Sequence, residues 1–127
     1  MHELAIAQSI VEVVEQHASE CRAARVKCVR LQVGEASGIV ADSLQFSFTM
    51  LAELSPILAG ARLTIASTPH RAHCRQCARE FAVQHFVPQC PTCATWSAEI
   101  VSGTELQILD MEIEGSEEVV RVSRCPE

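Results

Sequence analysis

Tyrosine is absent from this chain of 127 residues, and lysine occurs only once, as Lys27. Aromatic residues make up 4% of the sequence, and the formal net charge is −6 at pH 7. Proteins that bind nucleic acid need clustered Lys and Arg to contact phosphates, and many use aromatic side chains on which bases stack. The composition therefore argues against nucleic acid as a partner.

A long apolar run is also missing. Hydrophobic residues make up 48% of the chain, but no stretch reaches the roughly 18 residues that a membrane-spanning helix requires. The opening Met-His-Glu-Leu-Ala-Ile lacks the basic region and apolar core of a secretory signal. We therefore expect a cytoplasmic protein that does not enter a membrane, in a compartment where cysteines remain reduced.

Hydrophobic periodicity predicts a small α+β fold. Residues 3–23 carry apolar side chains every three or four positions, which is typical of an amphipathic helix. Residues 42–54 fit both helix and strand spacing, and we favour a helix with Asp42 or Ser43 as its N-cap. Alternating apolar residues predict three strands, around residues 29–33, 63–65 and 106–113. The predicted architecture is two helices on a three-stranded sheet, interrupted by an inserted four-cysteine zinc module.

Composition also predicts where the domains divide. Residues 70–98 hold four of the seven cysteines and little apolar content, so we expect them to form the inserted zinc-binding module. Residues 1–69 and 99–115 are expected to form the α+β domain around it. Residues 116–127 are expected to be a weakly ordered C-terminal tail.

The inserted module contains two Cys-x-x-Cys pairs, Cys74 with Cys77 and Cys90 with Cys93, and twelve residues separate the pairs. Two such turns brought together by a hairpin place four thiolates in a tetrahedron, which suits Zn²⁺. A site closed by four sulfurs has no open coordination position, so the zinc should be structural rather than catalytic. The alternative is a redox dithiol, which a single pair at a strand–helix junction would favour.

The other three cysteines share no spacing. Cys21 lies on the apolar stripe of the first helix, and we expect it to be a small core residue rather than part of a disulfide. Cys28 alternates out of the main face of its strand. Cys125 lies in the predicted tail, and we assign it no role.

The first three residues form a second candidate metal site. The Met1 amine, the His2 amide nitrogen and the His2 imidazole can chelate one metal in fused rings, and the Glu3 amide or a carboxylate can complete a plane. Square-planar nitrogen and oxygen donors suit Ni²⁺ or Cu²⁺. The alternative is a solvated helix start in which Glu3 favours the N-terminal end of the helix dipole.

Several features together resemble one known family. They are Met-His-Glu at the start, the amphipathic helix, a Gly-Glu-x-Ser turn at residues 34–37, the doubled Cys-x-x-Cys and a final Leu-Gln-Ile strand at residues 106–108. This combination resembles the HypA/HybF family of nickel metallochaperones for [NiFe]-hydrogenase maturation. The resemblance runs from Met1 to about Glu114.

The resemblance implies nickel at His2, helped by the Met1 amine and Glu3, and structural zinc on Cys74, Cys77, Cys90 and Cys93. It also implies a HypB-type GTPase and the hydrogenase large subunit as partners, and some members serve urease. We expect no enzymatic activity, and a monomer or weak homodimer.

Two positions bear on the details of that resemblance. Ala78 and Ala94 stand where many relatives have a histidine, which argues against a histidine exchange at the zinc site. Asp42 is the nearest candidate for an acidic residue beside the nickel.

Two other functions fit parts of the sequence. A zinc-ribbon adaptor that binds protein or nucleic acid without nickel would use the Arg-rich module and Trp96. The acidic remainder of the chain counts against nucleic acid. A small zinc enzyme would need a three-ligand metal with a base beside it, which the four-cysteine set does not provide.

Overall fold

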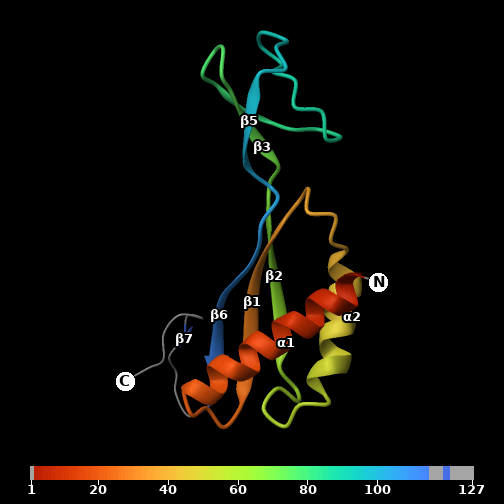
Figure 1. Cartoon of the computed structure of the whole chain (residues 1–127), viewed down its shortest axis with the longest axis vertical. Helices are drawn as coiled ribbons and strands as arrows, with labels where there is room; N and C mark the ends of the chain where they lie inside the picture. The colour runs from red at the N-terminus through yellow and green to blue at the C-terminus, as the bar shows by residue number, and fades with distance from the viewer. Residues whose placement is uncertain (1, 115–118, 121–127) are drawn as a thin grey trace. The chain divides into compact units, whose positions relative to one another are not determined.

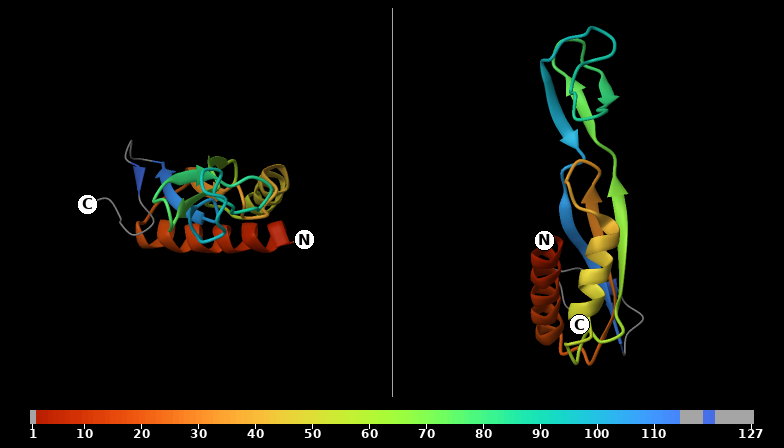
Figure 2. Two further views of the ribbon diagram at one scale, coloured as in Figure 1. Left: turned by 90° about the horizontal axis from the view of Figure 1, so that it is seen from above. Right: turned by 90° about the vertical axis from the view of Figure 1, so that its right-hand side faces the viewer.

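Two helices form one layer of the fold. The computed structural model describes residues 2–114 and Val119–Val120, and it begins with helix α1 (His2–Glu20). Helix α2 (Ala41–Ala52) packs against α1, as Figures 1 and 2 show from three directions. Fully buried apolar residues at three- and four-residue spacing explain the helices: Ala7, Val14 and Ala18 in α1, and Leu44, Phe48 and Ala52 in α2. No described helix is long and apolar enough to cross a membrane.

A sheet forms the second layer. Its strand order is β2 (Arg62–Thr68), β1 (Val26–Gly34), β6 (Leu106–Ile113), β7 (Val119–Val120). The first three are the predicted strands, and β7 is a short addition that pairs antiparallel with β6. The core side chains of β1 and β6 include Val29, Leu31 and Met111, all fully buried. The predicted α+β class with two helices on a sheet is confirmed.

The cysteine-rich segment has a small sheet of its own, which the sequence did not predict. Strand β3 (Arg71–Cys74) is central and pairs antiparallel with β4 (Glu80–Ala82) and with β5 (Ala98–Ser102). Its core is only five buried residues, two of them cysteines: Ala72, Cys74, Phe81, Val83 and Cys90. Such a core is too small to hold a fold by burial alone.

The chain divides into two compact units. One contains residues 1–31, 39–66 and 107–127, and the other contains residues 32–38 and 67–106. The first holds both helices, and the second holds the β4-β3-β5 sheet. The predicted tail, 116–127, lies outside the described residues except for Val119–Val120.

Two predictions in this part of the chain were wrong. Helix α2 begins one residue before Asp42, and its N-cap is Val40, whose side chain makes no cap hydrogen bond. The Val40 carbonyl instead accepts the backbone N–H of Leu44. Cys21 is half-buried and disulfide-bonded, and it follows the last residue of α1 instead of lying on the core stripe of the helix. Cys125 lies outside the described residues.

Three backbone segments cross closely at Gly34, Gly103 and His70. A Cβ atom on Gly34 would lie 2.1 Å from the Gly103 carbonyl oxygen, and one on Gly103 would lie 2.4 Å from the His70 Cα atom. The backbone N–H of Gly34 donates to the Glu105 carbonyl at 2.7 Å, so the crossing is also hydrogen-bonded. Only glycine fits, because the obstructing atoms belong to the backbone and cannot turn away.

Gly34→Ala should therefore lower the free energy of unfolding by about 3 kcal/mol, the upper range for forced overpacking. Gly38→Ala is the matched control, because a Cβ there meets nothing within 4 Å and only the positive φ of 79° opposes it; it should cost about 1 kcal/mol. Urea denaturation of both variants measures the difference. Equal costs would show that the crossing is not tight.

Candidate metal centres

The first Cys-x-x-Cys pair sits on a tight turn after β3. The Cys74 N–H donates to the Arg79 carbonyl at 2.8 Å, and the Ala78 N–H donates to the Cys74 carbonyl at 3.0 Å. The Cys77 N–H also donates to the Cys74 sulfur at 3.4 Å. Ala78 takes a left-handed conformation, with φ of 62°, to close the turn.

The second pair repeats this geometry sixteen positions later in the sequence. The Cys90 N–H donates to the Thr95 carbonyl at 3.0 Å, and the Ala94 N–H donates to the Cys90 carbonyl at 2.8 Å. Ala94 has φ of 60°. The two turns therefore have the same backbone hydrogen bonds at matching positions. In each turn, backbone N–H groups point at the sulfur of the first cysteine.

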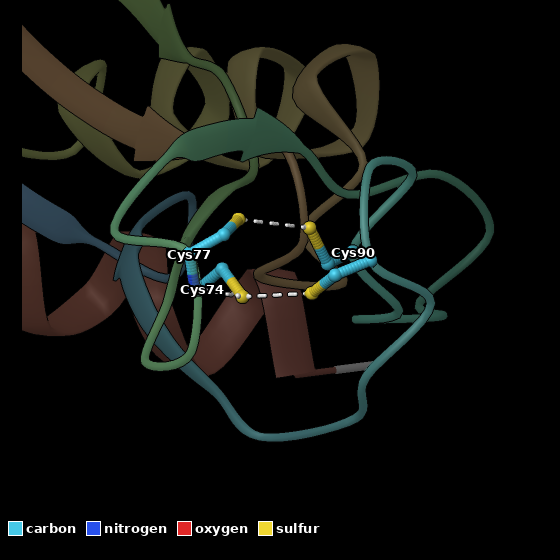
Figure 3. Close-up of side chains that lie close together, drawn as sticks. Cys74, Cys77 and Cys90 are labelled. Atoms are coloured by element: carbon cyan, nitrogen blue, oxygen red, sulfur yellow. Dashed lines mark hydrogen bonds between the residues drawn. The ribbon is translucent and has the colours of Figure 1, made fainter.

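The four sulfur atoms converge across the two turns (Figure 3). Cys74 and Cys93 sulfurs lie 3.5 Å apart, Cys77 and Cys90 sulfurs lie 3.6 Å apart, and all four lie within 4.8 Å of one another. Four thiolates around Zn²⁺ at 2.3 Å would be separated by about 3.8 Å, whereas a disulfide needs about 2.05 Å. All four are free cysteines. The spacing therefore fits a tetrahedral metal site better than a redox disulfide.

The first cysteine of each turn is the more acidic. The N–H of Cys77 lowers the pKa of the Cys74 thiol, and the N–H groups of Cys93 and Thr92 lower the pKa of Cys90 to about 6, although burial opposes both shifts. Hydrogen bonds to the charged form cause this, because they stabilise a thiolate.

The second cysteine of each turn behaves oppositely. The N–H of Arg79 lowers the pKa of Cys77 and that of Thr95 lowers the pKa of Cys93, but burial and the neighbouring thiols outweigh them. The pKa of Cys77 is therefore raised, and that of Cys93 is raised to about 11. Four thiolates this close together repel one another. A cation bound among them would offset that repulsion and favour ionisation of all four.

Arg71 does not balance charge at the sulfurs. Its Nε atom lies 3.2 Å from Glu80 Oε1, across the β3–β4 pair. His70 is buried with its ring 5.9 Å from that of Phe86. The local backbone dipoles, rather than these basic side chains, provide the stabilisation seen at the first cysteine of each turn.

The second candidate centre lies at the start of α1. The His2 side chain is 62% exposed, and its Nε2 atom lies 3.5 Å from Glu3 Oε2. Glu3 is buried, and its carboxylate accepts the backbone N–H of Val40 at 3.3 Å, which lowers the pKa of Glu3. A charged carboxylate is thus fixed beside an exposed imidazole. Met1 lies outside the described residues.

A hollow of about 420 Å³ adjoins this pair, between the first turns of the two helices. The side chains that line it are Glu3, Leu4, Asp42, Ser43, Phe46 and Ser47. The fold thus brings Asp42 to the same hollow as Glu3, although they are far apart in sequence. Hydrophobic periodicity did not predict that Ser43 and Ser47 line this hollow or that the Val40 N–H binds Glu3 beside it.

The family model described as HypA, a hydrogenase/urease nickel incorporation metallochaperone, matches residues 1–113. The chain belongs to the HypA family. The hydrogenase maturation factor HypA of Geobacter metallireducens is 39% identical over 114 residues, which cover 90% of this chain and 100% of that protein. The one of Streptomyces avermitilis is 42% identical over 114 residues, 87% of this chain and 86% of that protein.

Two solved HypA structures share the fold. The solution structure of the nickel metallochaperone HypA from Helicobacter pylori has a TM-score of 0.63 at 23% identity, over 87% of this chain and 96% of that one. A second HypA solution structure has a TM-score of 0.70 at 24% identity, over 91% and 98%. The HypA family is one of metallochaperones, so the prediction that the chain is not an enzyme is confirmed.

The left-handed backbone of Ala78 and Ala94 should lower the stability of the two cysteine turns. Left-handed backbone costs an alanine about 1–2 kcal/mol and costs glycine little. Changing both residues to glycine should therefore raise the free energy of unfolding of the metal-loaded protein by about 1–2 kcal/mol, after the greater entropy of unfolded glycine is subtracted. Urea denaturation at fixed metal concentration measures it.

Ala82→Gly provides the control for that pair. Ala82 is exposed in β4 and is not among the residues with positive φ, so glycine there should destabilise by about 0.5–1 kcal/mol. If all three changes destabilise alike, the turns do not carry the strain that we assign to them.

Proposed function

We propose that this HypA-family chain binds Ni(II) at its N-terminus and delivers it to the large subunit of [NiFe]-hydrogenase during maturation. Zinc on Cys74, Cys77, Cys90 and Cys93 holds the module in its fold. A HypB-type GTPase is the partner that the family resemblance implies. The family's description as a nickel incorporation metallochaperone supports the proposal, as does the exposed His2 at the start of α1.

The position of His2 is the main structural support for the proposed nickel site. As the first residue of α1 it has a backbone N–H without an intrahelical acceptor, because the first four N–H groups of any helix lack one. The amide nitrogen and the exposed imidazole of His2 are therefore the two donors that we assign to the metal, with the Met1 amine as a third. Glu3 and Asp42 line the adjoining hollow and are the candidate oxygen donors.

The chemistry of these donors suits transfer rather than storage. Nitrogen and oxygen ligands in a plane prefer Ni²⁺ over Zn²⁺, whereas four thiolates in a tetrahedron prefer zinc. An exposed imidazole leaves the metal open to an incoming ligand from an acceptor. Binding releases protons from the imidazole and the amide, so nickel affinity should rise with pH.

His2→Ala should abolish stoichiometric Ni(II) binding while the zinc content and the fold stay unchanged. The physical reason is the loss of the imidazole that closes the chelate ring. Isothermal titration of untagged protein, with metal analysis of zinc, measures both. His17→Ala is the matched control, because His17 is a half-buried imidazole on the same helix, 3.8 Å from Glu20.

The control should keep wild-type nickel affinity. Equal nickel affinity of His2→Ala and wild type would contradict the assignment of the site. Loss of zinc along with nickel in His2→Ala would contradict the separation of the two centres.

A further inference from the structure

Helix α2 carries apolar side chains on its outer side as well as on its inner side. The inner row is fully buried and consists of Leu44, Phe48 and Ala52. The outer row recurs every four residues and consists of Phe46 and Met50 on α2 and Leu54 in the turn that follows it, which are 67%, 49% and 81% exposed. Outward positions of a surface helix are normally polar, so a row of large exposed apolar side chains marks an interaction surface.

The helices around this row are strongly acidic. Together α1 and α2 contain five carboxylates and no Lys or Arg, and their basic side chains are His2 and His17. Asp42 stands four residues before Phe46 on the same side of α2, and Glu53 directly precedes Leu54. The Asp42 carboxylate therefore lies at one end of the row, whereas the Glu53 carboxylate accepts the backbone N–H of Gly60 at 3.3 Å.

One end of the row is concave. Phe46 forms a wall of the hollow between the first turns of the two helices, opposite Leu4, whose side chain is 42% exposed. A partner side chain in this shallow hollow would contact Phe46 and Leu4 together, which suits an anchoring position of an interface.

We propose that the outer row of α2 is the docking surface for a basic amphipathic helix of a partner protein. Bulky apolar side chains at helical spacing on the partner pack on Phe46, Met50 and Leu54, as in other helix-in-groove complexes. A Lys or Arg beside them pairs with Asp42 at one end of the row, which sets the orientation of the partner helix.

The charges favour this occupant over two others. A bilayer with anionic lipids would bring negative headgroups against two helices that hold five carboxylates and no Lys or Arg. A second copy of the chain would bring like-charged carboxylates together, which costs binding energy. A basic amphipathic helix, in contrast, gains binding free energy both from the apolar outer row and from the nearby carboxylates.

Fluorescence anisotropy of the full-length, zinc-loaded chain tests the proposal. The probe is a labelled helical peptide with leucines along one face and lysines on the others. Met50→Lys should weaken binding about tenfold, as expected for a central apolar contact. Leu109→Lys adds the same charge at another exposed apolar residue, on β6, and should change affinity less than about twofold. Wild-type affinity should also fall at high salt.

Several results would overturn the proposal. One is an equal loss of peptide affinity in Met50→Lys and Leu109→Lys. Another is equally tight binding when the lysines of the peptide are replaced by glutamates. A third is equally tight binding when the leucines are scattered around the peptide helix. Sedimentation that shows a dimer abolished by Met50→Lys would make a second copy the occupant. Binding to phosphatidylcholine–phosphatidylglycerol vesicles that Met50→Lys abolishes would make it a membrane. Nickel binding by Met50→Lys should equal wild type, so the docking and nickel proposals fail separately.

Discussion

The convergence of four cysteine sulfurs to within 4.8 Å is the constraint on which the β4-β3-β5 module depends. The module's buried core has five residues, and two of them, Cys74 and Cys90, belong to the cluster itself. The N–H groups of Arg79 and Thr95 act to lower the pKa of Cys77 and Cys93, but burial and the neighbouring thiols outweigh them and raise the pKa of both, so a cation among the four would favour their ionisation. The binding free energy of a metal in this cluster would therefore add to the folding free energy of the module. Backbone geometry prepares the site, since both turns use the same hydrogen bonds and the same left-handed alanine.

The two candidate centres divide the chemistry between them. Sulfur encloses a metal in a closed tetrahedron, which suits a permanent structural ion. At the start of α1, an exposed imidazole stands beside a carboxylate that the Val40 N–H keeps ionised. In the function that we propose, that arrangement would leave one side of a bound metal accessible, as a carrier requires. The acidic helices and the exposed outer row of α2 lie in the same compact unit as His2 and Glu3. A surface for an acceptor or partner thus belongs to the unit that we propose carries the metal.

Sequence periodicity predicted most of the fold. Helix α1 and strand β1 each bury a regular stripe, whereas β2 buries Leu63 and β6 buries Met111 and Ile113 at its end. Periodicity was ambiguous for α2, and the structure explains why: apolar residues on its inner and outer rows interleave as Leu44, Phe46, Phe48 and Met50, which imitates strand alternation. The doubled Cys-x-x-Cys predicted the sulfur cluster, since local turns determine that geometry. The Val40 cap, the left-handed Ala78 and Ala94, and the meeting of Asp42 with Glu3 at one hollow depend on backbone conformation and tertiary packing that spacing does not encode.

The central claim is that Ni(II) binds at the N-terminus without a cysteine ligand, whereas the four cysteines bind a different metal. X-ray absorption at the nickel edge, on untagged protein loaded with one zinc and one nickel per chain, tests it most directly. The account predicts planar coordination by nitrogen and oxygen with an imidazole contribution, and no sulfur in the nickel shell. Nickel–sulfur scattering, or an octahedral or tetrahedral shell that is unchanged in His2→Ala, would contradict it.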